Sequence, residues 1–230
     1  IIFTVHNAAY QGLFPKEVFE KTGLPDKVYS MDGIEYHDQL NFMKAGLMYS
    51  DAITTVSPTY AKEIRSSNDY GFGLEGIFKK KAKVTKGILN GMDMDLWDPE
   101  NDKHVPEKFS ADDMSGKVEN KKALLEKFGM PFDEDVPVIG IVSRLVDQKG
   151  FDMIEKRLES ILKLKCQLVV LGSGEKKYET MLEKTAKKNA KQMGVHIGFD
   201  EELAHLIEAG SDMFLMPSKY EPCGLNQLYS

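Results

Sequence analysis

The stretch VPVIGIVSRL, residues 136–145, decides the fold of this chain. It is a run of β-branched residues with a polar end, which is typical of a buried strand that stops at the edge of a parallel sheet. Strand and helix signals alternate from there onward. The expected strands are 136–143, 167–171, 195–198 and 213–216, and the expected helices are 151–164, 175–193, 201–209 and one from about 224. This alternation predicts right-handed βαβ crossovers and a parallel α/β sheet.

A shorter set of similar signals precedes this stretch. Strands are expected at 1–5, 52–56 and 84–89, and a helix at 41–49. Ser57-Pro58 predicts the start of another helix, because serine is a good N-cap and proline suits the first helical position. Residues 14–39 carry little signal. The glycines of YGFGLEG resemble a phosphate loop only weakly, because no buried strand precedes them.

The composition changes twice along the chain, and these changes predict its domains. Residues 92–135 are polar, acidic and proline-bearing, so we expect an interdomain linker region there. Residues 1–91 are then the carboxyl-terminal part of a first α/β lobe, and residues 136–230 the amino-terminal part of a second. The start, IIFTVHN, reads as a buried strand entered in its middle, so we expect an internal fragment of a longer protein.

Net charge and cysteine content exclude several classes of protein. The formal net charge of −6 argues against a nucleic-acid or membrane-surface partner, but it leaves room for a local basic pocket that binds an anionic small molecule. The two cysteines form no motif with each other, which suits a reducing cytoplasm. No CxxC or clustered histidine predicts a metal site.

SKYEPCGLNQLYS, residues 218–230, is the first candidate site. We expect the backbone N–H groups of Gly224, Leu225 and Asn226 to open a helix at the carboxyl edge of the sheet, where they favour a phosphate group. Glu221 beside an anion site is repelled unless it binds something else, such as sugar hydroxyls. An anion site next to a carboxylate predicts that the ligand is a sugar phosphate or a nucleotide sugar. The alternative is an ordinary βα loop with a surface glutamate.

Two cations follow the first strand of the second lobe. Arg144 and Lys149 are predicted to lie at the same edge, where they would clamp a diphosphate and neutralise a leaving group without a metal ion. Solvated surface cations are the alternative. Gly172 and Gly174 suit close approach of a ligand to the backbone. Phe199 would offer a ring face to a base, although core packing explains it equally well.

A further candidate site follows the first strand of the chain. His6 and Asn7 are placed where their polar groups would bind sugar hydroxyls or a phosphate oxygen. The alternative is a turn in which these side chains satisfy the local backbone.

Seven segments in order resemble the bacterial glycogen synthase and starch synthase family. They are HNAAYQG, NFMKAGLMYSDAITTVSPTYAKEI, KGILNGMD, GIVSRLVDQKGFD, LGSGE, GFDEELAHLIEAGSD and MPSKYEPCGLNQLYS. The match covers nearly the whole chain, and only about 14–39 and 100–135 are weakly diagnostic. It implies two Rossmann-like lobes in the GT-B arrangement, both incomplete in this chain. It also implies a retaining glucosyltransferase that uses ADP-glucose and an α-1,4-glucan acceptor and requires no metal or other cofactor.

The resemblance also assigns roles to individual residues. It implies that Arg144 and Lys149 stabilise the departing diphosphate, helped by the amides of Gly224 and Leu225. The residues implied to face the transferred glucose are His6, Asn7, Asn90 and Glu221, with Cys223 against it. Phe199 matches the aromatic residue that stacks on adenine.

No covalent nucleophile is evident. A double-displacement glycosidase uses two carboxylates about 5 Å apart, and here only Glu221 is placed for such a role. The position at which related retaining transferases often carry a second glutamate is Tyr229. We therefore favour same-face attack by the 4-hydroxyl of the acceptor.

Two other functions stay open, namely a GT-B transferase that uses UDP-glucose and a non-catalytic glucan-binding relic. Intact Arg144, Lys149 and Glu221 argue against the relic. The lysine and glycine motif of the family's first lobe is absent from this sequence, so we expect the 230-residue chain alone to have little or no activity. A bacterial cytoplasm is the expected location, or a plastid if the source is a plant.

Overall fold

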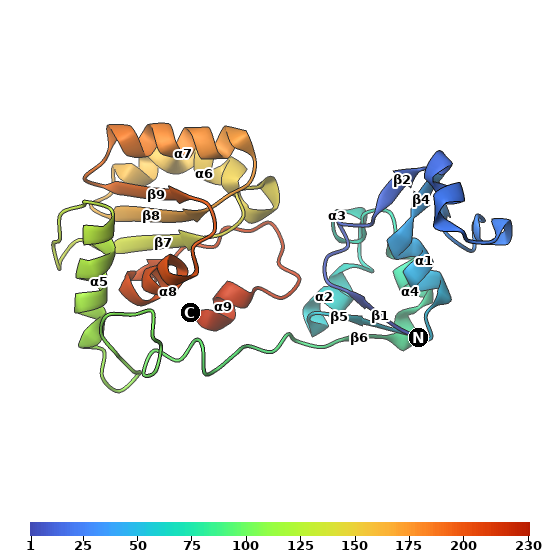
Figure 1. The fold of residues 1–230 in the computed structure, drawn as a ribbon, viewed down its shortest axis with the longest axis horizontal. Helices are drawn as coiled ribbons and strands as arrows, with labels where there is room; N and C mark the ends of the chain where they lie inside the picture. The colour runs from blue at the N-terminus through green and yellow to red at the C-terminus, as the bar shows by residue number, and fades with distance from the viewer. The chain divides into compact units, whose positions relative to one another are not determined.

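The computed structural model describes all residues from Ile1 to Ser230. The chain forms two compact units (Figure 1). The first consists of Ile1–Gly91 with Glu221–Gly224, and the second of Met92–Tyr220 with Leu225–Ser230. Each unit has its own sheet, and each is described separately below.

The first unit is built on a parallel sheet of three strands in the order β1-β5-β6. The strands are β1 (Ile2–Val5), β5 (Ala52–Thr55) and β6 (Thr85–Gly87). The α-helices are α1 (Phe42–Tyr49), α2 (Pro58–Glu63), α3 (Asn68–Gly71) and α4 (Glu75–Lys80). The three strands, α1 and α2 confirm the elements that the sequence predicts for this part, and α3 and α4 are additional helices.

Side-chain caps explain where two of these helices begin. The Asn41 side chain accepts a hydrogen bond from the Lys44 amide at 2.8 Å, and Ser57 accepts one from the Tyr60 amide at 3.0 Å. Pro58 follows as the first residue of α2, as predicted. The glycines of YGFGLEG do not form a phosphate loop: Gly71 ends α3 and Gly76 lies inside α4.

Residues 13–41 form a small antiparallel sheet that the sequence did not predict. Its strands are β2 (Leu13–Pro15), β3 (Glu35–Tyr36) and β4 (Gln39–Asn41), in the order β2-β4-β3. Short 3₁₀ helices lie at Lys16–Thr22, Asp26–Val28 and, later in the chain, Ala82–Val84. Strands of two or three residues are too short to show an alternating pattern, and a local cluster of Phe19, Ile34 and Leu40 holds them.

The second unit is built on a parallel sheet of four strands in the order β10-β7-β8-β9. The strands are β7 (Val138–Val142), β8 (Gln167–Gly172), β9 (Met193–Ile197) and β10 (Met213–Phe214). The helices are α5 (Gly116–Lys127), α6 (Phe151–Leu162), α7 (Lys176–Lys188), α8 (Glu201–Gly210) and α9 (Leu225–Tyr229). The predicted parallel sheet is confirmed.

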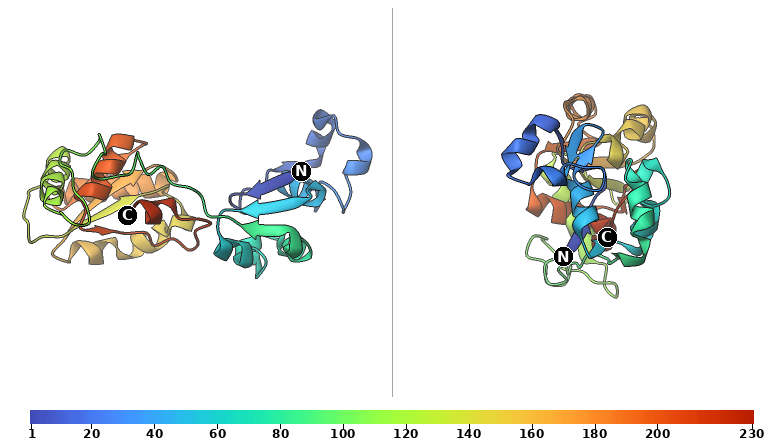
Figure 2. Two further views of the ribbon diagram at one scale, coloured as in Figure 1. Left: turned by 90° about the horizontal axis from the view of Figure 1, so that it is seen from below. Right: turned by 90° about the vertical axis from the view of Figure 1, so that its right-hand side faces the viewer.

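Two hydrophobic clusters sandwich this sheet. Figure 1 shows α6 and α7 on one face and α5 and α8 on the other, and Figure 2 shows helices on both faces from a second side. Side chains from α6 and α7 pack with Ile141, Leu168 and Val170 on one face. Those from α5 and α8 pack with Val138 and Val169 on the other. The central strand β8 is buried along its whole length, as expected for a strand covered on both faces.

The sequence predicted a helix to residue 193, but α7 ends at Lys188. The chain turns at Asn189, whose side-chain amide donates to the Thr185 carbonyl at 2.9 Å. Met193 then pairs with Leu168 in the sheet and is buried. A helix continued to this point would remove Met193 from the core, so tertiary burial overrides the helical pattern of the sequence.

Helix α5 is a further element that the sequence did not predict. It lies within residues 92–135, which the sequence suggested were a linker region, and this segment is grouped with the second unit. The α5 sequence is largely charged, so its composition hides the two fully buried residues Leu124 and Leu125. Asn120 is also buried, and its side-chain amide donates to the Glu107 carbonyl at 2.8 Å.

We expect Leu124→Ala to lower the free energy of unfolding by about 2–5 kcal/mol, because it leaves a cavity between α5 and the sheet. Leu164→Ala is the matched control, since Leu164 is 60% exposed and its removal should cost less than about 0.5 kcal/mol. Chemical denaturation of the full-length protein measures both. Equal midpoints for the two variants would contradict a structural role for α5.

Candidate active site

The second sheet gathers several of the predicted site residues at one edge. Its four strands are parallel, so their carboxyl ends share that edge. Arg144 follows β7, Gly172 ends β8 and Phe199 follows β9. Arg144 is exposed and Lys149 is half-buried. The parallel topology of the strands alone brings these residues to the same edge of the sheet.

Lys149 lies at the end of a 3₁₀ turn, Asp147–Lys149, that a core tyrosine holds. The hydroxyl of buried Tyr178, on α7, donates to the Asp147 carboxylate. This bond and an ion pair with Lys177 at 3.3 Å lower the pKa of the Asp147 carboxyl below its usual value. Burial, followed by the hydrogen bond to Asp147, raises the pKa of Tyr178. The bond therefore joins the turn that carries Lys149 to the hydrophobic core.

The same turn is also joined to the loop that follows β10. The Lys219 amide donates to the Gln148 carbonyl at 2.9 Å, and the Gln148 side-chain amide donates to the Tyr220 carbonyl at 3.4 Å. The Lys219 ammonium pairs with Asp152 at 3.0 Å. The loop that precedes Glu221 is thus bonded to the loop that carries Arg144 and Lys149.

Glycine at positions 172 and 174 is required by the protein's own backbone. A Cβ atom added to Gly172 would lie 1.8 Å from the Ser143 carbonyl oxygen, and one added to Gly174 would lie 2.4 Å from the Leu145 carbonyl oxygen. The Gly174 amide donates to the Glu179 carboxylate at 3.1 Å. Packing between two site loops therefore explains these glycines, and a ligand contact at them stays a prediction.

Phe199 is 91% exposed, which excludes the alternative that it packs in the core. It follows Gly198, whose φ of +149° is a conformation that favours glycine. The ring is presented to solvent beyond the end of β9, so a planar ligand has access to it.

Helix α9 begins at Leu225, directly after Gly224 with φ +80°. The Asn226 side-chain amide donates to the Val142 carbonyl at 3.2 Å, so this side chain fastens α9 to the end of β7. Anion binding by the amides of residues 224–226 stays a prediction.

Three further predicted residues belong to the first unit. His6 is exposed and Asn7 half-buried, and both line a hollow of about 410 Å³ with Tyr10, Gln11 and Phe42 among its other walls. The Asn7 side chain accepts a hydrogen bond from the Ala9 amide at 3.0 Å, as in the turn proposed as the alternative for this loop. Asn90 is half-buried and lies three residues beyond the end of β6.

Glu221 and Cys223 are both half-buried, and Cys223 is a free thiol. The structure groups Glu221–Gly224 with the first unit and Arg144 with the second. The approach of Glu221 to Arg144 and Lys149 around one ligand therefore stays a prediction. No three His, Cys, Asp or Glu side chains come together as a group able to hold a metal ion. No helix combines the length and apolar character needed to cross a membrane.

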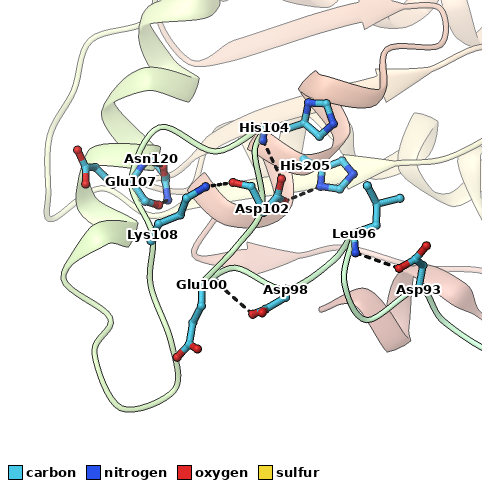
Figure 3. A network of polar contacts seen from close by, with 10 residues as sticks. All are labelled: Asp93, Leu96, Asp98, Glu100, Asp102, His104, Glu107, Lys108, Asn120 and His205. Atoms are coloured by element: carbon cyan, nitrogen blue, oxygen red, sulfur yellow. Dashed lines mark hydrogen bonds and ion pairs between the residues drawn. The ribbon is translucent and has the colours of Figure 1, made fainter.

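A buried polar network that was not predicted from the sequence lies in the second unit (Figure 3). Its centre is a hydrogen bond between Asp102 and His205 on α8, with Nδ1 of the ring 2.6 Å from a carboxylate oxygen. Trp97 stacks on His205. The only signal in the sequence was a histidine within the apolar run of α8, and its partner lies 103 residues away in a segment without regular structure.

A cavity of about 260 Å³ lies beside this network. It is lined by Trp97, Lys117, Glu208 and Tyr229 among others, and by none of the predicted site residues. Burial raises the pKa of the Glu208 carboxyl to about 7.

Two family models match the chain in succession. Residues 1–80 match the starch synthase catalytic domain, and residues 124–228 match the glycosyl transferases group 1. The whole chain is 50% identical to a glycogen synthase of Myxococcus xanthus and 48% identical to one of Anaeromyxobacter sp. strain Fw109-5, and covers 48% of each. This chain therefore spans about half the length of these curated relatives.

A solved structure also matches the whole chain. The catalytic domain of starch synthase IV from Arabidopsis thaliana, bound to ADP and acarbose, matches 100% of this chain with a TM-score of 0.92 and 36% identity, and the match covers 48% of that protein. The fold and the family models define the class, a glycosyltransferase fold of the GT-B type. Within that class, the chain is similar over its whole length to glycogen synthases and to a starch synthase.

We expect Gly150→Ala to destabilise the protein more than Gly129→Ala. Both glycines have positive φ, +79° and +64°, so each alanine carries a conformational cost of about 1 kcal/mol. A Cβ at 150 would also lie 2.2 Å from the Pro217 carbonyl oxygen, whereas one at 129 would meet nothing within 4 Å. The free energy of unfolding should therefore fall by at least about 1 kcal/mol more in Gly150→Ala than in Gly129→Ala, measured by denaturation of the full-length protein. Equal losses would contradict the close packing of the two site loops.

Proposed function

We propose that the full-length protein transfers glucose from ADP-glucose to the non-reducing end of an α-1,4-glucan with retention of configuration, in glycogen or starch synthesis. The observation that carries this proposal is the pair of bonded loops at the edge of the second sheet, with Arg144 and Lys149 on one and the start of the Glu221 loop on the other. The similarity of the whole chain to glycogen synthases supports it. The related starch synthase IV was bound to ADP and acarbose, which supports the nucleotide and the glucan.

In this proposal, Arg144 and Lys149 stabilise the charge that develops on the ADP leaving group. A guanidinium fork and an ammonium placed at the oxygens of a diphosphate stabilise that charge more in the transition state than in the ground state. The backbone amides of Gly224 and Leu225 add hydrogen bonds to the same phosphates. Positive charge is then supplied by the protein, and we propose that the reaction needs no metal ion.

The remaining predicted residues bind the sugar and the base. Phe199 stacks on the adenine, for which its exposed ring is suited. Gly172 and Gly174 keep the neighbouring backbone close to the site. The groups proposed to contact the transferred glucose are His6, Asn7, Asn90, Glu221 and Cys223. The 4-hydroxyl of the glucan then attacks from the face that the diphosphate leaves, which preserves the configuration without a covalent intermediate.

Two other functions make different predictions. A GT-B transferase that uses UDP-glucose would retain the cationic loop but prefer a donor with uracil as its base. A glucan-binding relic would bind the acceptor without turnover, and it would have no need for the cations at 144 and 149. We propose the cytoplasm as the site of the reaction.

Donor competition in the full-length protein separates these functions. We expect transfer of labelled glucose from ADP-glucose to glycogen, with UDP-glucose at the same concentration competing poorly. A chelator of divalent cations should leave the rate unchanged, because the leaving-group charge is met by Arg144 and Lys149. Preference for UDP-glucose would indicate the UDP-glucose transferase, and glycogen binding without transfer would indicate the glucan-binding relic.

We expect Arg144→Ala and Lys149→Ala each to lower kcat by about 100-fold or more, because each removes charge stabilisation made mainly in the transition state. Lys156→Ala is the matched control, since this lysine is exposed on α6 and should keep the normal rate. Circular dichroism and thermal denaturation check that the fold is retained. Near-normal rates in both variants would remove the two cations from the mechanism.

A further inference from the structure

The buried pair Asp102–His205 uses both oxygens of its carboxylate. The Nδ1–H of His205 donates to one oxygen at 2.6 Å, and the His104 amide donates to the other at 2.8 Å (Figure 3). His205 is 1% exposed and Asp102 6% exposed. A hydrogen-bonded pair this well buried fixes the plane of the imidazole ring, since rotating it would leave a buried carboxylate unpaired.

Trp97 lies between two rings that are nearly parallel to it. Its ring centroid is 3.7 Å from that of His205 with an interplanar angle of 10°, and 4.0 Å from that of Tyr229 with an angle of 6°. Two rings at stacking distance from one indole cannot share a face without overlapping, so they lie on opposite faces. The rings of His205, Trp97 and Tyr229 form a continuous stacked column, and Asp102 is hydrogen-bonded to the edge of the His205 ring.

Tyr229 is the last residue of α9, a helix of five residues that is too short to be stable alone and has no fully buried residue. The helix therefore depends on contacts with its surroundings. The Asn226 side chain bonds to the end of β7, and the Ser230 hydroxyl, just beyond the helix, donates to Glu208 at 2.7 Å. The stack on Trp97 adds an aromatic contact to these polar ones.

We propose that this stacked column positions α9, and with it the loop that ends at Gly224, for binding of the nucleotide-sugar donor. This inference rests on the proposed function. The loop is bonded to the cationic turn at Lys219 and Tyr220, and α9 follows its other end. Tyr220 and Leu225, on either side of residues 221–224, are thus both held within the second unit. Trp97, Asp102, His205 and Tyr229 are thus positioning residues, which act through α9 without touching the donor.

The column also gives a role to Tyr229 itself. Its ring lies 4.0 Å from that of Trp97, so it joins α9 to the column by an aromatic contact. In this inference, Tyr229 acts as a structural support of the donor site.

The test uses the full-length protein with the substitutions Tyr229→Leu, Tyr229→Phe and Trp97→Leu. We measure the Kd for ADP by calorimetry and the KM for ADP-glucose and for glycogen. Tyr229→Leu and Trp97→Leu should raise the Kd for ADP and the KM for ADP-glucose about tenfold, with the KM for glycogen unchanged. Tyr229→Phe keeps a ring over the indole and should stay within about twofold of the unsubstituted protein.

Leu124→Ala is the control for a purely structural effect. It should lower stability in the same unit without changing the Kd for ADP, because Leu124 packs on α8 and the sheet and not in the column. If Tyr229→Leu lowers the melting temperature but leaves the ADP affinity unchanged, the column only stabilises the fold and the inference is wrong. If the unsubstituted protein does not bind ADP, the proposed function itself is wrong. Tyr229 is half-buried at a helix end, so its variants are expected to fold even if Trp97→Leu does not.

Discussion

Backbone packing at the edge of the second sheet is the constraint on which the candidate site depends. The segment 143–150 lies so close to two neighbouring segments that no side chain fits between them. Gly172 gives room for the carbonyl of Ser143, and Gly150 gives room for that of Pro217. Arg144 and Lys149 therefore project from a loop whose path is fixed by main-chain contacts. A preorganised cation is worth more to a transition state than one that must be ordered during the reaction.

The charges near this loop are arranged so that its acidic residues have partners of their own. Asp147 accepts a hydrogen bond from Tyr178 and pairs with Lys177. Asp152 pairs with Lys219. In a chain with a net charge of −6, this pairing reduces the acidic field at the very edge where a diphosphate is proposed to bind. Local arrangement, and not the overall charge, thus decides what this surface attracts.

Residues 92–115 show how a polar segment becomes part of a core. It has no helix or strand, yet Asp102 is buried and its carboxylate is fully used by His205 and the His104 amide. Trp97 extends the contact to Tyr229. A segment held by a few specific polar and ring contacts looks like a linker by composition, because its apolar residues are few and follow no period.

The sequence by itself determined the α/β class, the parallel sheet of the second unit and most of its elements, since strand and helix periods and caps such as Ser57 are local signals. It also placed Arg144, Lys149 and Phe199 at one sheet edge, because chain order in a βαβ fold fixes where loops emerge. Only the tertiary structure decided that α7 stops before Met193 and that Gly172 accommodates the chain's own backbone. Only it brought Asp102 to His205. Those outcomes depend on contacts between residues far apart in the chain, which no local period records.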